Sequence, residues 1–157
     1  TLGWVIGSEA ELALLHAQEA DEFGNIRHLS TMTYADQLIA RSADTVLVSV
    51  DRIVPSEDII SRPRETSIPC IYVDAVVEIP FGAHPTGSFP NYSIDEDHID
   101  AYAACADAAR KGAPDGDRDL QAYIKQHVIA PTDQESYLAS VGGTIRMDDL
   151  VAEAQAL

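Results

Sequence analysis

Two apolar runs rich in β-branched residues limit what this chain can fold into. The first is Thr45-Val-Leu-Val-Ser-Val50, and the second extends from Ile71 to Ile79, where Pro80 ends it. Neither run alternates polar and apolar residues as a strand of a half-exposed antiparallel sheet does, so both are typical of buried parallel strands. We therefore predict that residues 45–50 and 71–79 are parallel neighbours in a covered core.

Shorter signals along the rest of the chain alternate expected strands with expected helices. Strands are expected at residues 11–18 and 26–30, on either side of a turn at 21–25. Helices are expected at residues 33–43, 55–58, 93–109 and 117–128, from Thr132 onward and at 147–156, with caps at Thr33, Ser93 and Thr132. This order predicts an α/β fold, an open and mainly parallel sheet covered by helices and followed by a helical C-terminal tail.

The composition allows a sizeable core and argues against two classes of partner. Of the 157 residues, 46% are apolar, which suits one domain with a buried core. The formal net charge is −16, from 26 acidic and 10 basic side chains. A field of this sign repels phosphate backbones and anionic lipid surfaces, so we expect neither nucleic acid nor membrane as a partner.

The cysteines and the chain start bear on compartment and completeness. Cys70 and Cys105 have no metal-ligand spacing, and both are expected to be small buried hydrophobic residues. No targeting segment or long apolar span is recognisable, so a reducing cytoplasm is the expected compartment. The chain starts with Thr1 rather than Met and carries few strands for such a sheet. We therefore expect an N-terminal part of the natural polypeptide to be missing.

The loop after the second apolar run gathers residues suited to binding a ligand. Gly82, His84 and Ser88 follow a strand end, which is where open α/β sheets place ligands. Gly82 permits close approach of the backbone. His84 can line a site or serve as a structural hydrogen-bonding residue, and Ser88 can donate to a carboxylate or simply belong to a turn.

Other polar residues admit a structural explanation beside a functional one. Asn25 can point its amide at a ligand, or it can merely tolerate the tight turn after Gly24. The acidic run 95–97, followed by His98, matches no EF-hand spacing and is explained by a charged first turn of a helix, so no metal site is predicted. Glu78, a carboxylate within an apolar strand, would need an arginine or a backbone donor if it were buried.

Two motifs resemble the α subunits of family I CoA-transferases, and more narrowly those of the glutaconate CoA-transferase type. Ala20-Asp-Glu-Phe-Gly-Asn25 is similar to the Ala-Asp-x-x-Gly-Asn turn of the superfamily. Val73–Glu78 with Phe81-Gly-Ala-His-Pro85 resembles the glutaconate type, and the tail from Tyr123 to Leu138 is similar to its helical end. The resemblance covers only the second half of a typical α subunit. It therefore implies that residues 1–157 are the C-terminal part of a single α-subunit domain.

The resemblance implies a reaction that is shared between subunits. It implies part of a CoA-transferase that moves CoA between an acyl-CoA thioester and a glutaconate-type or other short or dicarboxylic acid. The nucleophilic glutamate, which forms a glutamyl-CoA intermediate, is implied on a partner β subunit, because its Ser-Glu-Asn-Gly signature is absent here. No catalytic residue and no permanently bound cofactor are expected in this chain, for which CoA and acyl-CoA are substrates. The implied partners are the missing N-terminal half and the β subunit. The chain alone is expected to be inactive.

The same resemblance implies which residues bind the substrate. Phe81, Gly82, Ala83, His84 and Ser88 are expected to line the acyl pocket facing the partner subunit, with the following further candidates for lining the site: Gln18, Gly24 and Asn25. The phosphates of CoA would need local N–H groups or basic residues, because the net charge opposes them.

The sequence is also compatible with two other functions. One is a CoA-thioester hydrolase or ring-cleaving relative on the same scaffold, as in steroid-ring degradation, and the other is a non-catalytic interaction subunit. Transfer of CoA to an added carboxylate would distinguish the transferase from the hydrolase, which releases free CoA in water.

Overall fold

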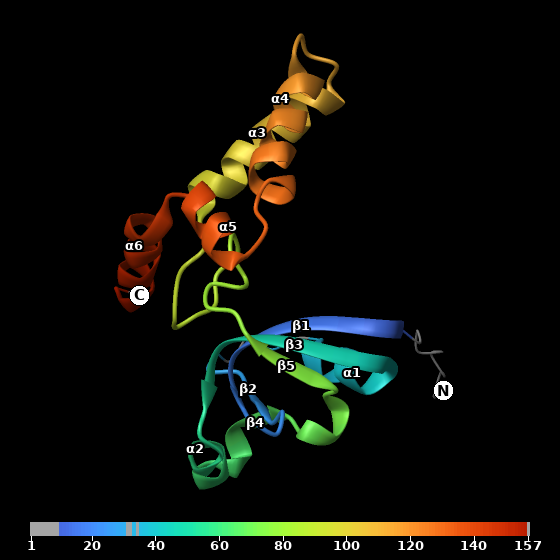
Figure 1. The fold of residues 1–157 in the computed structure, drawn as a ribbon, viewed down its shortest axis with the longest axis vertical. Helices are drawn as coiled ribbons and strands as arrows, with labels where there is room; N and C mark the ends of the chain where they lie inside the picture. The colour runs from blue at the N-terminus through green and yellow to red at the C-terminus, as the bar shows by residue number, and fades with distance from the viewer. Residues whose placement is uncertain (1–9, 31–32, 34, 157) are drawn as a thin grey trace, which may run out of the picture. The chain divides into compact units, whose positions relative to one another are not determined.

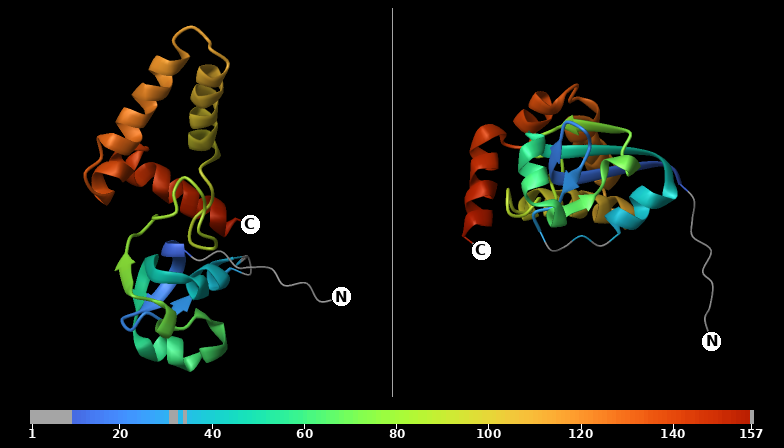
Figure 2. Two further views of the ribbon diagram at one scale, coloured as in Figure 1. Left: turned by 90° about the vertical axis from the view of Figure 1, so that its right-hand side faces the viewer. Right: turned by 90° about the horizontal axis from the view of Figure 1, so that it is seen from below.

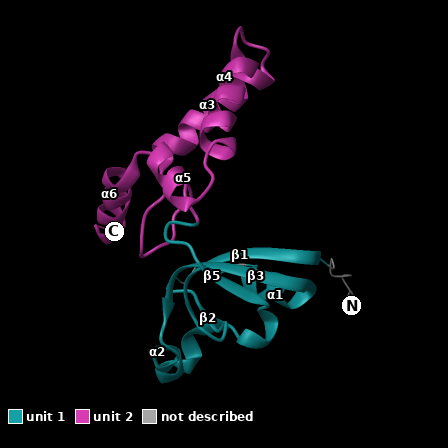
Figure 3. Cartoon of the chain, in the orientation of Figure 1, with its two compact units in different colours: residues 1–82 teal, residues 83–157 magenta. Residues whose placement is uncertain are grey.

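The computed structural model describes residues 10–30, 33 and 35–156, and it divides the chain into two compact units. Unit 1 is Thr1–Gly82 and unit 2 is Ala83–Leu157 (Figures 1 and 3). The assignment of both units to one α-subunit domain stays a prediction. Each unit is an assembly of its own elements, with its own buried residues.

Unit 1 holds the sheet. Its elements are β1 (Ala10–Asp21), β2 (Ile26–Arg27), α1 (Asp36–Ser42), β3 (Ala43–Val54), α2 (Ser56–Ser61), η1 (Pro63–Glu65), β4 (Thr66–Ile68), η2 (Cys70–Tyr72) and β5 (Ala75–Glu78). The strand order is β4-β2-β1-β3-β5, with β1, β3 and β5 mutually parallel (Figure 1). The short strand β2 pairs antiparallel with both β1 and β4, so β4 runs in the same direction as β1. The predicted α/β class, with an open and mainly parallel sheet, is confirmed.

The two apolar runs are parallel neighbours, as predicted, but the second strand is shorter than predicted. Val48 pairs with Val76 in the β3–β5 register. Residues 70–72 form a 3-10 turn instead of strand, because the Pro69 carbonyl accepts from the Tyr72 amide at 3.1 Å and the Asn25 side chain accepts from the Cys70 amide at 3.1 Å. One local hydrogen bond and one contact with the distant Asn25 thus bend a segment whose composition favours a strand.

The sheet buries one face within this chain and exposes the other. Ala13, Ala17, Val46 and Val48 are among the buried residues of one face, whereas Leu14, on the opposite face, is 72% exposed. Side chains alternate between the faces of a strand, so an apolar run in sequence yields an apolar surface on both sides. Helix α1 contacts β1, β3 and β4, and α2 contacts β1. Covering of both faces in the assembled protein stays a prediction.

Unit 2 is helical, which confirms the predicted helical tail. Its elements are α3 (Glu96–Arg110), α4 (Gly116–Ile124), the π-helical turn η3 (Lys125–Ile129), α5 (Gln134–Ser140) and α6 (Gly143–Gln155). Helices α3 and α4 pack side by side around a short connection (Figure 2). Tyr92, Met147 and Leu150 are buried. No helix in the described part of the chain is long and apolar enough to cross a membrane.

The predicted helix caps were wrong by one to two residues. Helix α3 is capped by Asp95, whose carboxylate accepts from the His98 amide at 3.1 Å, and not by Ser93. Helix α5 is capped by a reciprocal pair of Asp133 and Ser136 rather than by Thr132. In both places a carboxylate occupies the cap, where it accepts hydrogen bonds and complements the positive helix end.

The remaining differences concern Thr33 and the cysteines. Helix α1 begins at Asp36 without a side-chain cap, so Thr33 does not cap it. Cys70 and Cys105 are free and only partly buried, which corrects the expectation that both are fully buried.

Candidate functional site

The Ala-Asp-x-x-Gly-Asn motif builds the turn between β1 and β2. One carboxylate oxygen of Asp21 accepts from the amides of Phe23 (3.1 Å) and Asn25 (2.9 Å), and the other accepts from the Asn25 side chain (2.9 Å). Gly24 takes φ +91°, a conformation that glycine adopts without strain. Asn25 also accepts from the Cys70 amide, so its side-chain amide is committed to the fold rather than directed at a ligand.

Gly24 and Gln18, the other two candidates near this turn, have different surroundings. Gly24 borders a hollow of about 140 Å³, together with Phe23, Val73 and Asp74. Gln18 is buried on β1, and its side-chain oxygen accepts from the Leu29 amide at 3.1 Å. Gly24 therefore lines an open space, whereas Gln18 fastens the segment that follows β2.

Glu19 forms a buried ion-pair cluster next to this motif. Its carboxylate is hydrogen-bonded by Arg27, with Nε at 2.7 Å, and by Arg52 on β3. Burial acts to raise the pKa of Glu19, but the hydrogen bonds from Arg52 and Arg27 outweigh it and hold the pKa below its ordinary value. Glu78, in contrast, is exposed and accepts from the Ile53 amide at 2.6 Å, so it needs no arginine.

Gly82 lies directly against His16 in unit 1. A methyl group at position 82 would come within 2.8 Å of the Ile79 carbonyl oxygen and 3.0 Å of the His16 Cε1 atom. Phe81, which precedes it, has a positive φ of 61°. The backbone thus approaches His16 as closely as only a glycine allows, which agrees with the sequence-based reason for Gly82.

His16 is the centre of a polar cluster that the sequence did not reveal. Its Nε2 lies 3.2 Å from a carboxylate oxygen of Asp51, and its Nδ1 lies 2.9 Å from the Ser49 hydroxyl. Because the carboxylate can only accept, Nε2 carries a proton, and the Ser49 hydroxyl also lies 3.3 Å from the Leu15 carbonyl oxygen, to which it donates. The His16 side chain is 16% exposed, so the cluster reaches the surface of unit 1 beside Gly82.

His84 is the centre of a second polar cluster, in unit 2. Its side chain is 0% exposed, with Nε2 3.1 Å from an Asp95 oxygen and Nδ1 2.7 Å from the Tyr137 hydroxyl. Asp95 also binds the Arg146 guanidinium, at 2.9 Å from Nη2 and 3.2 Å from Nε. Both nitrogens of His84 are therefore satisfied within unit 2, the geometry expected of a residue that braces the segment.

Charge and burial shift the pKa values of this cluster in opposite directions. Burial acts to raise the pKa of Asp95, but hydrogen bonds from Arg146, His84 and the His98 amide hold it well below its usual range. Burial raises the pKa of Tyr137 to about 12, with smaller contributions from Tyr123 and Asp95. The cluster is thus an ionised carboxylate held between an arginine and a histidine.

Ala83 and Ser88 join the same part of unit 2 through Tyr92. The Ala83 amide donates to the Tyr92 hydroxyl at 2.9 Å, and the Ser88 amide donates to the Tyr92 carbonyl at 3.1 Å. Ser88 and Tyr92 are both buried. The structure therefore groups Ala83, His84 and Ser88 in unit 2, while Phe81 and Gly82 belong to unit 1.

A row of aromatic rings extends from His84. His98 lies 5.3 Å from His84 and 5.0 Å from His127 between ring centroids, and its Nε2 is 2.6 Å from the Tyr123 hydroxyl. Burial lowers the pKa of His98 and of His127, and for His98 the neighbouring His84 and His127 lower it further. Among the described residues, no group of three or more His, Cys, Asp or Glu side chains is placed to hold a metal ion.

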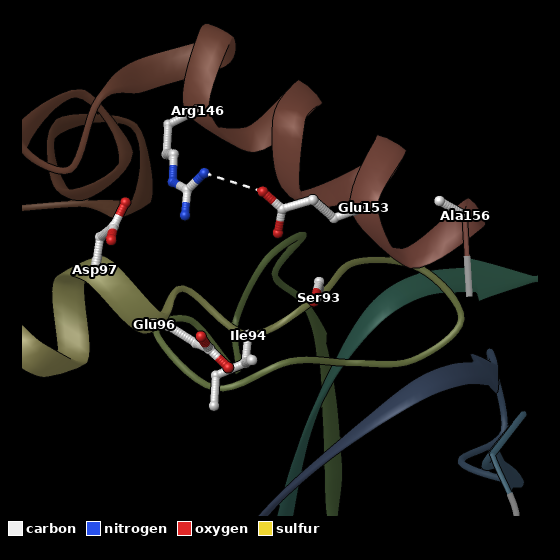
Figure 4. A pocket seen from close by; sticks show the side chains of 7 residues that line it. All are labelled: Ser93, Ile94, Glu96, Asp97, Arg146, Glu153 and Ala156. Atoms are coloured by element: carbon white, nitrogen blue, oxygen red, sulfur yellow. Dashed lines mark hydrogen bonds and ion pairs between the residues drawn. The ribbon is translucent and has the colours of Figure 1, made fainter.

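A hollow in unit 2 is acidic. It has a volume of about 490 Å³, and α3 and α6 contribute Glu96, Asp97, Arg146 and Glu153 to it (Figure 4). Its arginine is already paired with Glu153 at 3.3 Å and with Asp95. The carboxylates outnumber the cation, so this hollow repels anions such as CoA.

Comparisons with known proteins identify the family. Residues 5–79 match the family model for Coenzyme A transferase. The chain is 32% identical over 136 residues to the A-type subunit of glutaconate CoA-transferase from Acidaminococcus fermentans, covering 87% of this chain and 40% of that protein. The crystal structure of that glutaconate CoA-transferase matches with a TM-score of 0.78 and 29% identity, over 89% of this chain and 41% of that one. The chain belongs to the family I CoA-transferases, among their α subunits.

A second relative is named as a hydrolase subunit rather than a transferase subunit. The cholesterol ring-cleaving hydrolase IpdA subunit of Mycobacterium tuberculosis (strain CDC 1551 / Oshkosh) is 34% identical over 98 residues, covering 61% of this CoA-transferase chain and 34% of that protein. The chain spans about two fifths or less of the length of these relatives. Activity, substrates and partners of the whole protein are therefore proposals.

Proposed function

We propose that this chain contributes to CoA transfer between an acyl-CoA thioester and a carboxylic acid, in an enzyme of the glutaconate CoA-transferase type. The observation that carries the proposal is that both of its motifs have defined places in a fold shared with glutaconate CoA-transferase. The turn at 20–25 ties β1 to residue 70, and Gly82 brings the backbone onto His16.

The nucleophile is proposed on a partner subunit. In this scheme a glutamate carboxylate of a β subunit attacks the thioester carbonyl and takes the acyl group as a mixed anhydride, which releases CoA as its thiolate. The thiolate then attacks the glutamyl carbonyl, which frees the donor carboxylate and leaves CoA on the glutamate as a thioester. The acceptor carboxylate attacks this thioester to give a second anhydride, and the released thiolate attacks its acceptor carbonyl, which yields the new acyl-CoA and restores the glutamate. No permanently bound cofactor is required, because CoA enters and leaves as part of the substrates. We place the assembled enzyme in the cytoplasm, where its partners are the remainder of the α subunit together with the β subunit.

We propose two different roles for the residues of the 81–88 segment. Phe81, Gly82 and Ala83 are the proposed lining of the acyl pocket, because glycine there admits close approach. His84 and Ser88 are buried, so we propose that they hold this segment in place rather than contact the acyl group. Direct contact by either residue, the expectation from sequence, would require the segment to rearrange.

The reaction class is tested with the assembled enzyme. Incubation with an acyl-CoA and an isotopically labelled carboxylate should give labelled acyl-CoA, detected by mass spectrometry. Free CoA formed in water without labelled product would instead favour the hydrolase, which the similarity to the IpdA subunit keeps as the second candidate. Absence of CoA binding by the assembled complex would leave the non-catalytic interaction subunit.

The chain alone should be inert in the same assay. No nucleophilic glutamate with the family's signature is found in residues 1–157, so the covalent step has no carboxylate to proceed through. We expect no labelled product above a heat-denatured control. Transfer by the purified chain without any partner would contradict the placement of the nucleophile on the β subunit.

Gly82→Ala should lower kcat/KM of the assembled enzyme about tenfold. The added methyl group would lie 2.8 Å from the Ile79 carbonyl oxygen, so the backbone of this segment or the His16 ring must move. Overpacking of this kind costs about 1–3 kcal/mol, and small displacements of positioning groups are expensive in rate. Steady-state kinetics measures the effect.

Gly112→Ala serves as the matched control. Gly112 has a positive φ of 66° but open space around it, so the substitution strains the backbone without touching the proposed site. It should lower the melting temperature and spare the kinetics. Equal kinetics for Gly82→Ala and the wild type would remove Gly82 from the acyl pocket.

A further inference from the structure

A hollow in unit 1 differs in charge from the rest of the chain. It has a volume of about 480 Å³ and lies among the segment after β2, helix α1, η1 and β4. Its charged lining residues are Arg62, Arg64 and Glu65, so arginines outnumber carboxylates there. In the whole chain, acidic residues outnumber basic ones 26 to 10, which makes a surplus of arginine in one hollow informative.

Arg64 is the uncommitted cation of this hollow. Arg27 and Arg52 bind Glu19, and Arg41 lies over the Tyr72 ring at 5.4 Å. Arg62 is paired with Glu65 at 2.9 Å. Among the described residues, Arg64 has no ion pair or ring contact, and it is exposed.

The charge of Glu65 is already shared. Its carboxylate lies 2.9 Å from Arg62 and 3.9 Å from the buried Arg27. Arg27 is mainly bound to Glu19, so Arg62 is the cation that offsets the Glu65 carboxylate, and the Arg64 charge remains in excess. An anion entering the hollow meets a net attraction at Arg64.

Polar groups around the arginines can complete an anion site. Ser67 donates its hydroxyl proton to the Ile26 carbonyl at 3.1 Å and therefore accepts from His28 Nδ1 at 2.6 Å. These two hydrogen bonds hold the His28 and Ser67 side chains in place along one side of the hollow. Gln37 and Thr66 also line the hollow and provide an amide and a hydroxyl. Guanidinium groups with such neutral donors form strong, charge-assisted hydrogen bonds to phosphate oxygens.

We propose that this hollow binds a phosphate group of a phosphorylated ligand, with Arg64 and Arg62 as its charged partners. The assignment of that phosphate to CoA rests on the proposed function, since CoA is a polyanion and the acidic hollow of unit 2 would repel it. Binding of a phosphate as such depends on the hollow alone.

The experiment is isothermal titration of the purified 157-residue chain with inorganic phosphate, 3′,5′-adenosine diphosphate, CoA and glutarate. We expect 3′,5′-adenosine diphosphate and CoA to bind, with an affinity that falls as KCl is raised. Arg64→Ala should weaken binding about tenfold or more, and the double variant R62A/R64A should abolish it. A thermal melt of each variant without ligand verifies that it is folded.

Arg118→Ala is the matched control, because Arg118 is exposed and paired with Asp115 and Asp119 in unit 2. It removes the same charge from the chain and should leave binding unchanged. Equal weakening by R118A, unchanged affinity of R64A, or binding of glutarate but of no phosphate compound would each overturn the proposal. Binding of inorganic phosphate and 3′,5′-adenosine diphosphate without binding of CoA would uphold the phosphate site and overturn its assignment to CoA. The transfer assay of the assembled enzyme tests the proposed function independently.

Discussion

Asp95→Ala should lower the free energy of unfolding of unit 2 by about 3 kcal/mol or more. The carboxylate is buried, and it receives hydrogen bonds from Arg146, His84 and the His98 amide. Removing one partner of a buried pair typically costs about 3–5 kcal/mol, because the other charge is left uncompensated. The Arg146 side chain is 24% exposed and regains some solvation, which places the effect at the lower end.

The loss extends beyond the ion pair. Asp95 also caps α3, and losing a cap costs about 1 kcal/mol by itself. His84 Nε2, whose side chain is fully buried, would lose its acceptor. Amide hydrogen exchange along α3 and α6 measures the change, because it reports the opening of unit 2 independently of unit 1.

Asp107→Ala provides the contrast on the same helix. Asp107 is paired with Arg110 and Lys111 at the surface, where it is 41% exposed. Solvent screens exposed pairs and they contribute little to stability, so hydrogen exchange should change little. Similar protection in the Asp95→Ala and Asp107→Ala variants would show that the buried cluster does not hold unit 2 together.

The sequence predicted those parts of the fold that depend on local chemistry. The run 45–50 consists of residues that suit a buried strand wherever the chain places it, and the turn at 21–25 follows from Gly24 and its neighbours. The prediction was wrong at residues 70–72, where composition favoured a strand. A local hydrogen bond from Tyr72 to Pro69 and a hydrogen bond from Cys70 to Asn25, 45 positions away, hold a 3-10 turn there instead, and the second of these cannot be read from the local sequence.

The polar clusters depended even more on tertiary structure. Sequence singled out His84 but gave no means of finding Arg146, which lies 51 positions from Asp95. The His16 cluster needs the β1–β3 register, which pairs His16 with Ser49 and leaves Asp51 on the same face two residues later. The sequence shows that Ser49 and Asp51 are two residues apart, as side chains on one face of a strand are. It does not show that β1 is the neighbouring strand that places His16 beside them.

Unit 2 should lose stability as the pH falls below about 6.5. Burial lowers the pKa of His98 and His127 in the folded state, so the unfolded chain binds protons more readily than the folded one. Because the unfolded state binds more protons, the free energy of unfolding decreases as the pH falls from the pKa of the unfolded state to the lower pKa of the folded state. Each histidine contributes at most about 1.4 kcal/mol per pH unit in this window.

Geometry supports the same direction, because protonation of neighbouring rings is mutually unfavourable. His98 lies within 5.3 Å of both His84 and His127, so charging it places like charges in contact. Asp95 offsets part of this repulsion, and because its pKa is depressed in the folded state, its stabilisation is fully present above the ordinary pKa of 3.8 and is lost progressively only below that pH. Between pH 6.5 and 4 the histidines therefore determine the slope.

Hydrogen exchange or denaturant unfolding of unit 2 between pH 7.5 and 5 measures this slope, and H98Q/H127Q is the variant that should remove most of it. Glutamine keeps hydrogen-bonding capacity at both positions but does not titrate. The free energy of unfolding of the variant should therefore be lower than that of the wild type at pH 7.5, because the ring packing is lost. At pH 5 the two free energies should be similar, because the wild type has by then lost the contribution of its histidines. A further substitution, His28→Gln in unit 1, separates the units: burial also lowers the pKa of His28, so its removal should flatten the acid response of the sheet and leave that of unit 2 unchanged. An H98Q/H127Q variant with the same pH slope as the wild type would show that these two histidines titrate equally in both states, and the packed ring row would then play no part in the acid response.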